Sequence, residues 1–156
     1  MWIAVIGILS FLLLFAAILA LIFVFSRLLY GIFARRSGYA ELARRFLADH
    51  EPEGQKYTWQ TIRVGAVRWR FCTTIVLSPE GLYLAVMSRM PLFRDPAFNR
   101  HPAVLIPWSE VKAVYPTILF LQRAFALAIG DPKITAIAFF QRFLPLIEPY
   151  ISVRMS

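Results

Sequence analysis

The first 26 residues constrain this chain most, because they form an apolar run without a single charged side chain. From Met1 to Ser26 nearly every residue is Ile, Leu, Phe, Val or Ala. A helix rises about 1.5 Å per residue, so a helix over this run can cross a hydrocarbon core about 30 Å thick. We therefore expect residues 1–26 to form a transmembrane anchor.

A cleaved secretory signal is the alternative interpretation of this run. Such a signal has basic residues first, then an apolar segment of about 7–15 residues, then small residues at the cleavage site. Here no Lys or Arg precedes the run, and the small pair Ala16-Ala17 lies inside it. These features favour a retained anchor.

Positive charge follows the run and does not precede it. The nearest basic residues are Arg27, Arg35, Arg36, Arg44 and Arg45. Positive residues close to a span stay on the cytoplasmic side of the membrane. We expect an integral protein of a bacterial inner-membrane type, with its N-terminus outside and its C-terminal domain in the cytoplasm. The single Cys72, which has no partner for an internal disulfide, agrees with that compartment.

Residues 27–57 read as a basic amphipathic juxtamembrane helix and a linker. Ser37 can cap a helix over residues 38–48, whose apolar residues recur at helical spacing. This helix lies either in the membrane interface or on the domain that follows, and the sequence leaves both positions open. The next segment, Asp49–Gly54, has acids and His50 beside Pro and Gly, which indicates an exposed turn and no metal site.

The basic flank supplies the best candidates for binding. We expect Arg35, Arg36, Arg44 and Arg45 to face lipid headgroups, although a role in topology alone would also explain them. The net charge of +8 also raises nucleic acid as a partner. The remaining tryptophans alternate with apolar residues on expected strands, which favours core packing over base stacking, so we expect no nucleic acid. They are Trp59, Trp69 and Trp108.

From residue 58 the apolar period changes from helical to alternating. A strand over Val67–Leu77 places one set of residues on a buried face and Arg68, Arg70 and Thr74 on the other. The expected buried set is Val67, Trp69, Phe71, Thr73, Ile75 and Leu77. A turn at residues 78–81 and a return strand over residues 82–87 complete a hairpin.

The remaining chain alternates loops with short apolar runs. A polar loop over residues 89–102 precedes a buried strand at 103–106, and residues 109–114 fit a strand or a helical turn. Further strands are expected at 118–121, 125–129 and 134–139, with a turn at 130–132 and a helix at 140–151. Polar residues interrupt every later apolar run, so we expect no second span. Residues 58–156 are thus expected to form a small antiparallel β sandwich or open barrel with a C-terminal helix, in an α+β chain.

Catalytic signatures are scarce. Asp95, His101 and Ser109 could be cast as acid, base and nucleophile of a small hydrolase, the most distant alternative. Asp95 and His101 each precede a proline, which indicates extended loop structure, and Ser109 follows a strand. We expect Ile106 and Trp108 to pack in the core, and we expect no enzyme activity, no cofactor and no metal.

Two phrases resemble bacterial pleckstrin-homology-like (PH/GRAM-type) domains. They are Gly81-Leu82-Tyr83-Leu84 and Ile106-Pro107-Trp108-Ser109-Glu110-Val111, within a similarity over about residues 58–150. The resemblance implies a bent antiparallel sandwich or open barrel closed by a helix, with a binding or scaffolding role. It carries over no cofactor and no catalytic residue, and the basic lipid-phosphate pocket of eukaryotic relatives has no assignable match.

Two functional hypotheses follow. The first is a membrane-tethered, non-catalytic scaffold whose cytoplasmic β domain holds a protein partner. The second is a sensor of anionic lipid surfaces that uses the four juxtamembrane arginines.

Overall fold

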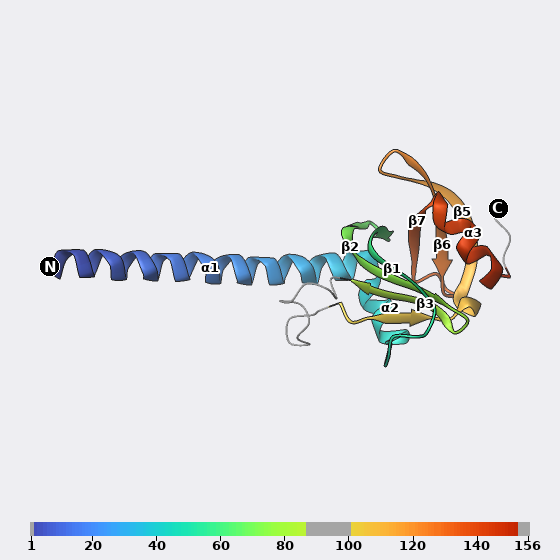
Figure 1. The fold of residues 1–156 in the computed structure, drawn as a ribbon, viewed down its shortest axis with the longest axis horizontal. Helices are drawn as coiled ribbons and strands as arrows, with labels where there is room; N and C mark the ends of the chain where they lie inside the picture. Colours follow the sequence, from blue (N-terminus) through green and yellow to red (C-terminus); the bar gives the residue numbers. More distant parts are fainter. Residues whose placement is uncertain (1, 87–100, 153–156) are drawn as a thin grey trace. The chain divides into compact units, whose positions relative to one another are not determined.

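The structure, a computed structural model, describes residues 2–86 and 101–152, and within the first helix the side chains of residues 10–25, 28, 29, 32 and 37. The chain divides into two compact units, Met1–Phe33 and Ala34–Ser156. Helix α1 (Trp2–Ser37) covers residues 2–26 of the run that was expected to be an anchor, and it continues beyond Ser26 (Figure 1). It continues because residues 27–37 include no helix breaker other than Gly31, and it ends where Gly38 adopts φ 75°.

All described side chains between Ser10 and Phe25 are exposed, and they include large apolar residues such as Phe11 and Leu21. Within the part of the chain whose placement is described, no helix is found that is long and apolar enough to cross a membrane.

Helix α2 (Tyr39–Arg45) is shorter than the expected helix over residues 38–48. Its N-cap residue is Gly38, which has no side-chain cap, and not Ser37 as expected. The Ser37 Oγ still accepts a hydrogen bond from the Tyr39 N–H at 3.1 Å. The chain after Arg45 leaves the helix to pair with a strand edge. The Leu105 N–H donates to the Phe46 carbonyl at 2.8 Å, and the Ala48 N–H donates to the Ala103 carbonyl at 3.0 Å.

The described residues of the second unit form seven strands in one antiparallel sheet, ordered β4-β3-β2-β1-β7-β6-β5. The sheet curls into an open half-barrel (Figure 1), which confirms the expected α+β class with an antiparallel β domain. The strands are β1 (Gln55–Val64), β2 (Val67–Ser78), β3 (Gly81–Val86), β4 (Val104–Ile106), β5 (Val111–Leu119), β6 (Gln122–Ile129) and β7 (Thr135–Phe140).

The curl follows from the connection between the two edge strands. Only Pro107 and a 3-10 turn, η2 (Trp108–Glu110), join β4 at one edge to β5 at the other. The half-buried Trp108 fixes this connection, because its indole N–H donates to the Ser78 carbonyl at 2.7 Å. Its ring also stacks on Tyr150, with ring centroids 5.1 Å apart. Ile106, the other expected core residue of this phrase, is fully buried.

The C-terminal segment is helical but more broken than expected for residues 140–151. It consists of η3 (Gln141–Phe143), α3 (Leu144–Ile147) and η4 (Glu148–Tyr150). Pro145 lies in the first turn of α3, where a missing N–H costs least. The buried Phe143 contacts the rings of Tyr57 and Phe139, so this segment packs on β1 and β7.

Strands β2 and β3 are buried on both faces over their paired lengths. Val76, Tyr83 and Ala85 form a second apolar cluster outside the half-barrel, packed against Ala48, Ala103 and Leu105. The segment after α2 thus covers the outer face of the sheet. This burial explains why Thr74, expected on the polar face of its strand, is buried instead.

Phe71 and residues 118–121 also differ from the expectation. Phe71 was expected on the buried face of β2 and is 70% exposed, because the β1–β2 register shifts beside it. Residues 118–121 were expected as a strand, whereas β5 ends at Leu119 and Phe120 and Leu121 form the turn to β6. Most of the expected loop over residues 89–102 lies outside the described residues.

Candidate functional site

Four large apolar residues adopt a backbone conformation that normally suits glycine or asparagine. Within residues 2–86 and 101–152, the non-glycine residues with positive φ are Trp59 (57°), Phe71 (49°), Phe120 (51°) and Leu121 (62°). Three of them are exposed, Trp59 by 52%, Phe71 by 70% and Leu121 by 99%. We call these four residues the left-handed quartet. Strained backbone positions cluster at functional sites, so the quartet marks the candidate site.

Trp59 and Phe71 lie at bulges between β1 and β2. Tyr57 pairs with Ile75 and Gln60 with Thr73, so β1 carries one extra residue between these pairs. A second register shift follows between Gln60 and Ile62. The Phe71 N–H donates to the Thr61 Oγ1 at 3.1 Å, so a side chain takes the place of a strand partner. The bulges turn both aromatic side chains outward, and the expectation that Trp59 packs in the core was wrong.

Phe120 and Leu121 form the tip of the β5–β6 hairpin. Leu119 pairs with Gln122, which leaves a two-residue turn with positive φ at both positions. This geometry is a type I′ turn, for which Asn-Gly is the favoured sequence. The flanking Ile118 is 65% exposed. The hairpin is the orange loop that projects beyond the rest of the sheet (Figure 1).

Arginines surround this tip. The guanidinium carbons of Arg68 and Arg70 lie 5.3 Å and 4.3 Å from the centroid of the Phe120 ring. Arg63 donates from Nη2 to the Thr117 Oγ1 at 2.9 Å, and Arg123 pairs with Ile118 across the hairpin. An open pocket lies among Arg68, Ile118, Phe120 and Leu121.

We call Arg63, Arg68, Arg70 and Arg123 the arginine collar. Within the described ranges, none of the four forms an ion pair. Among the described residues, no ion pair therefore neutralises the positive charge of the collar. Guanidinium groups bind phosphate and carboxylate oxygens through paired N–H donors, so the collar can receive an anion.

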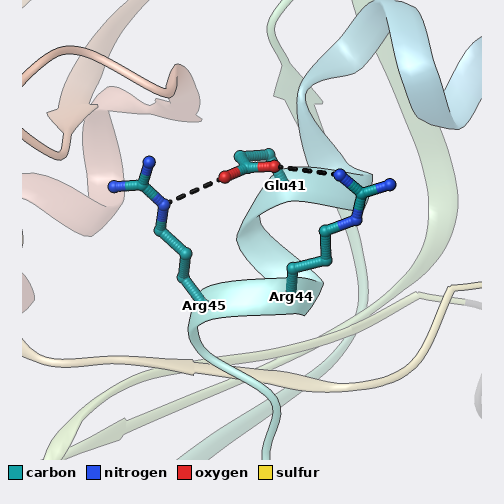
Figure 2. A network of polar contacts seen from close by, with 3 residues as sticks. All are labelled: Glu41, Arg44 and Arg45. Atoms are coloured by element: carbon teal, nitrogen blue, oxygen red, sulfur yellow. Dashed lines mark hydrogen bonds and ion pairs between the residues drawn. The ribbon is translucent and has the colours of Figure 1, made fainter.

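Of the four arginines expected to contact headgroups, Arg44 and Arg45 have described side chains. Figure 2 shows Arg44 and Arg45 on either side of Glu41. The Arg44 Nη1 lies 3.5 Å from the Glu41 Oε2, and the Arg45 Nε lies 3.0 Å from the Glu41 Oε1. The side chains of Arg35 and Arg36 lie outside the described set. One carboxylate shared by two arginines leaves a net charge of about +1 here, although the Arg44 side chain is 80% exposed.

The apolar face of α2 is buried in the domain. Tyr39 and Leu42 are fully buried, and the Tyr39 hydroxyl donates to the Pro102 carbonyl at 2.9 Å. Burial raises the pKa of Tyr39 far above its usual range, so the phenol stays protonated. Of the two positions that the sequence leaves open, α2 thus occupies the one on the domain.

The residues of the hydrolase alternative lie in different surroundings. His101 is 4% exposed and meets the rings of Tyr39 and Trp69 edge-on, at 5.5 Å and 4.7 Å. Burial lowers the pKa of His101 to about 4, so its imidazole is neutral at pH 7. Ser109 is exposed in the 3-10 turn, and Asp95 lies outside the described residues.

The other reactive groups do not gather into a site. In the described ranges no group of His, Cys, Asp and Glu side chains is arranged to hold a metal ion. Cys72 is half-buried, and burial raises the pKa of its thiol, which lowers its reactivity near pH 7.

Comparisons with known proteins leave the site to be interpreted from its geometry. No protein-family model matches the chain, and no curated protein matches it either.

Proposed function

We propose that this protein is a membrane-tethered, non-catalytic interaction module, whose cytoplasmic β domain binds a protein partner through Trp59 and Phe71. The observation that carries the proposal is the exposure of these two aromatic residues at left-handed positions. Water-exposed aromatic rings on strained backbone are unfavourable for the isolated domain. Aromatic residues are also the usual anchors at the centre of protein interfaces.

The tether is residues 1–26. The proposal rests on the sequence of the whole run, which has no charge, whereas the described side chains of α1 cover only part of it. The consecutive residues Ser10–Phe25 are exposed on every side of the helix and almost wholly apolar. A helix that is apolar on every side is stable only where it is shielded from water, in a protein core or in a membrane. The basic residues after the run support a cytoplasmic position for the β domain.

The resemblance to PH-like domains is part of the same proposal. Two antiparallel meanders, β1–β4 and β5–β7, are followed by a helical C-terminal segment. This order agrees with a bent sandwich or open barrel closed by a helix. A scaffolding role needs no cofactor and no catalytic group, and the neutral, buried His101 suits that role better than proton transfer at pH 7.

Site-specific photo-crosslinking in native membranes tests the partner surface. A benzoyl-phenylalanine at position 59 or 71 replaces one large aromatic residue with another, so it should disturb the fold little. We expect a discrete crosslinked protein from both positions. The matched control is the same residue at position 80, in the exposed β2–β3 turn, and it should give none. Equal products from positions 59, 71 and 80, or no product at all, would contradict the proposal.

A sensor of anionic lipid surfaces is the second candidate. The exposure of Arg44 favours it, and the ion pairs to Glu41 weaken it. Vesicle flotation of a form without residues 1–26 separates the candidates. If Arg35, Arg36, Arg44 and Arg45 bind headgroups, changing all four to Glu weakens flotation with anionic vesicles. A fraction of floated protein that is unchanged by these substitutions rejects the sensor.

A further inference from the structure

The tip of the β5–β6 hairpin combines exposed apolar side chains with cations at its base. Ile118, Phe120 and Leu121 form the tip, and Leu121 is 99% exposed. The proposed functions above use neither the tip nor the collar. The turn geometry would be met at lower cost by Asn-Gly, so the fold does not require the fully exposed Leu121 at this position.

The collar is held where the apolar tip begins. Arg68 and Arg70 lie over the Phe120 ring, and the Arg63 guanidinium is fixed by Thr117 on β5. These contacts place cations beside the apolar residues without neutralising them. Within residues 2–86 and 101–152 no carboxylate pairs with any of the four collar arginines.

We propose that this hairpin tip is a second membrane contact, which inserts Ile118, Phe120 and Leu121 into the interface of an anionic bilayer while the collar binds lipid phosphates. A bilayer interface offers apolar chains beneath a layer of anionic headgroups, which is the order of the tip and the collar. The fit is one of charge complementarity and of shape, since the tip is a narrow projection.

This inference does not depend on the proposed partner surface of Trp59 and Phe71. It rests on the proposed membrane tether, because a domain anchored by residues 1–26 stays near a bilayer. The test uses the full chain with Cys72→Ser and Leu121→Cys, labelled with an environment-sensitive fluorophore. It is placed in nanodiscs of phosphatidylcholine, with or without phosphatidylglycerol. The matched control carries the label at Glu80→Cys, in the exposed β2–β3 turn.

We expect the label at position 121 to shift to the blue and to be quenched several-fold by brominated lipids in anionic discs. The label at position 80 should stay in water. Adding Arg68→Gln and Arg70→Gln should remove most of the quenching at position 121. Adding Arg44→Gln and Arg45→Gln, which removes the same charge from α2, should leave it unchanged.

The outcomes separate this inference from the tether. A chain that does not co-elute with the discs refutes the tether, and added anionic vesicles then report on the tip alone. A label at position 121 that stays in water in discs and vesicles overturns the inference. The inference is also overturned if the label at position 121 is shielded from water in detergent, without lipid, to an extent that rises with protein concentration. That result would reveal a contact between protein molecules.

Discussion

Leu121 shows how a single residue carries two unfavourable features at once. Its side chain is almost wholly exposed, and its backbone has φ 62°. A bulky residue in the left-handed region costs about 1–2 kcal/mol relative to its normal conformations. Neither burial nor a hydrogen bond of the side chain offsets that cost within the domain. The fold alone therefore gives no reason for leucine at this position.

Replacing Leu121 with Gly should accordingly stabilise the protein by up to about 1 kcal/mol, because glycine adopts this conformation without strain. Chemical denaturation followed by tryptophan fluorescence measures the free energy of unfolding. The control is Leu119→Ala, two residues earlier at a buried position, which should destabilise by about 2–5 kcal/mol. A loss of stability in Leu121→Gly would show that the leucine supports the fold.

His101 makes stability depend on pH. Its pKa is about 4 in the folded state against 6.5 in the unfolded chain, so the unfolded state binds the proton more readily. The contribution of His101 to the free energy of unfolding is fully present above pH 6.5, and it is lost as the pH falls towards 4. The loss is about 3 kcal/mol, at about 1.4 kcal/mol per pH unit. Tyr39 does not titrate in this range, because its pKa is raised by burial.

Thermal unfolding between pH 7 and pH 4.5 checks this prediction. His101→Phe keeps a ring between Tyr39 and Trp69 and removes the titrating group. We expect the variant to lose less stability over this range than the parent protein does. If the melting temperatures of the two proteins fall equally between pH 7 and pH 4.5, groups other than His101 cause the pH dependence.

At the scale of elements, the β1–β2 turn holds the junction between α1 and α2. Gly65 has φ 55°, and a Cβ there would lie 2.5 Å from the Ser37 carbonyl oxygen. The same carbonyl accepts a hydrogen bond from the Thr135 Oγ1 at 2.7 Å. One turn and one strand thus fix the residue at which α1 ends.

Gly65→Ala should destabilise the domain by about 2 kcal/mol or more, because it adds backbone strain and a clash at one point. Ala66→Ser, at the exposed neighbouring position, should change stability by less than about 0.5 kcal/mol. Urea denaturation of both variants measures the difference. Similar midpoints for Gly65→Ala and the parent would mean that the junction moves freely.

Elements with strong local signals were predictable from the sequence. The Ser78–Gly81 turn between two apolar runs gave the β2–β3 hairpin, and Gly130–Pro132 gave the β6–β7 turn. The left-handed quartet was not predictable, because Trp59, Phe71, Phe120 and Leu121 are all residues that favour buried strands. Their exposure depends on register shifts and a two-residue turn, and both are set by tertiary pairing. The collar was missed for the same reason, since Arg68 on β2 and Phe120 at the hairpin turn meet only in the folded sheet.

At the scale of the whole molecule, the chain joins a helix whose first 26 residues carry no charge to a basic β domain. We propose that residues 1–26 span a membrane and leave the β domain on the cytoplasmic side. The apolar run, the arginines after it and the single cysteine all support this arrangement. The proposed partner surface and the proposed hairpin contact both assume this arrangement.

Cysteine accessibility in oriented membrane vesicles tests this claim most directly. In a Cys72→Ser background, a membrane-impermeant maleimide should label Glu80→Cys only in inside-out vesicles, and the protein should resist alkaline extraction. Labelling of Glu80→Cys in right-side-out vesicles, or release of the protein at alkaline pH, would contradict the account.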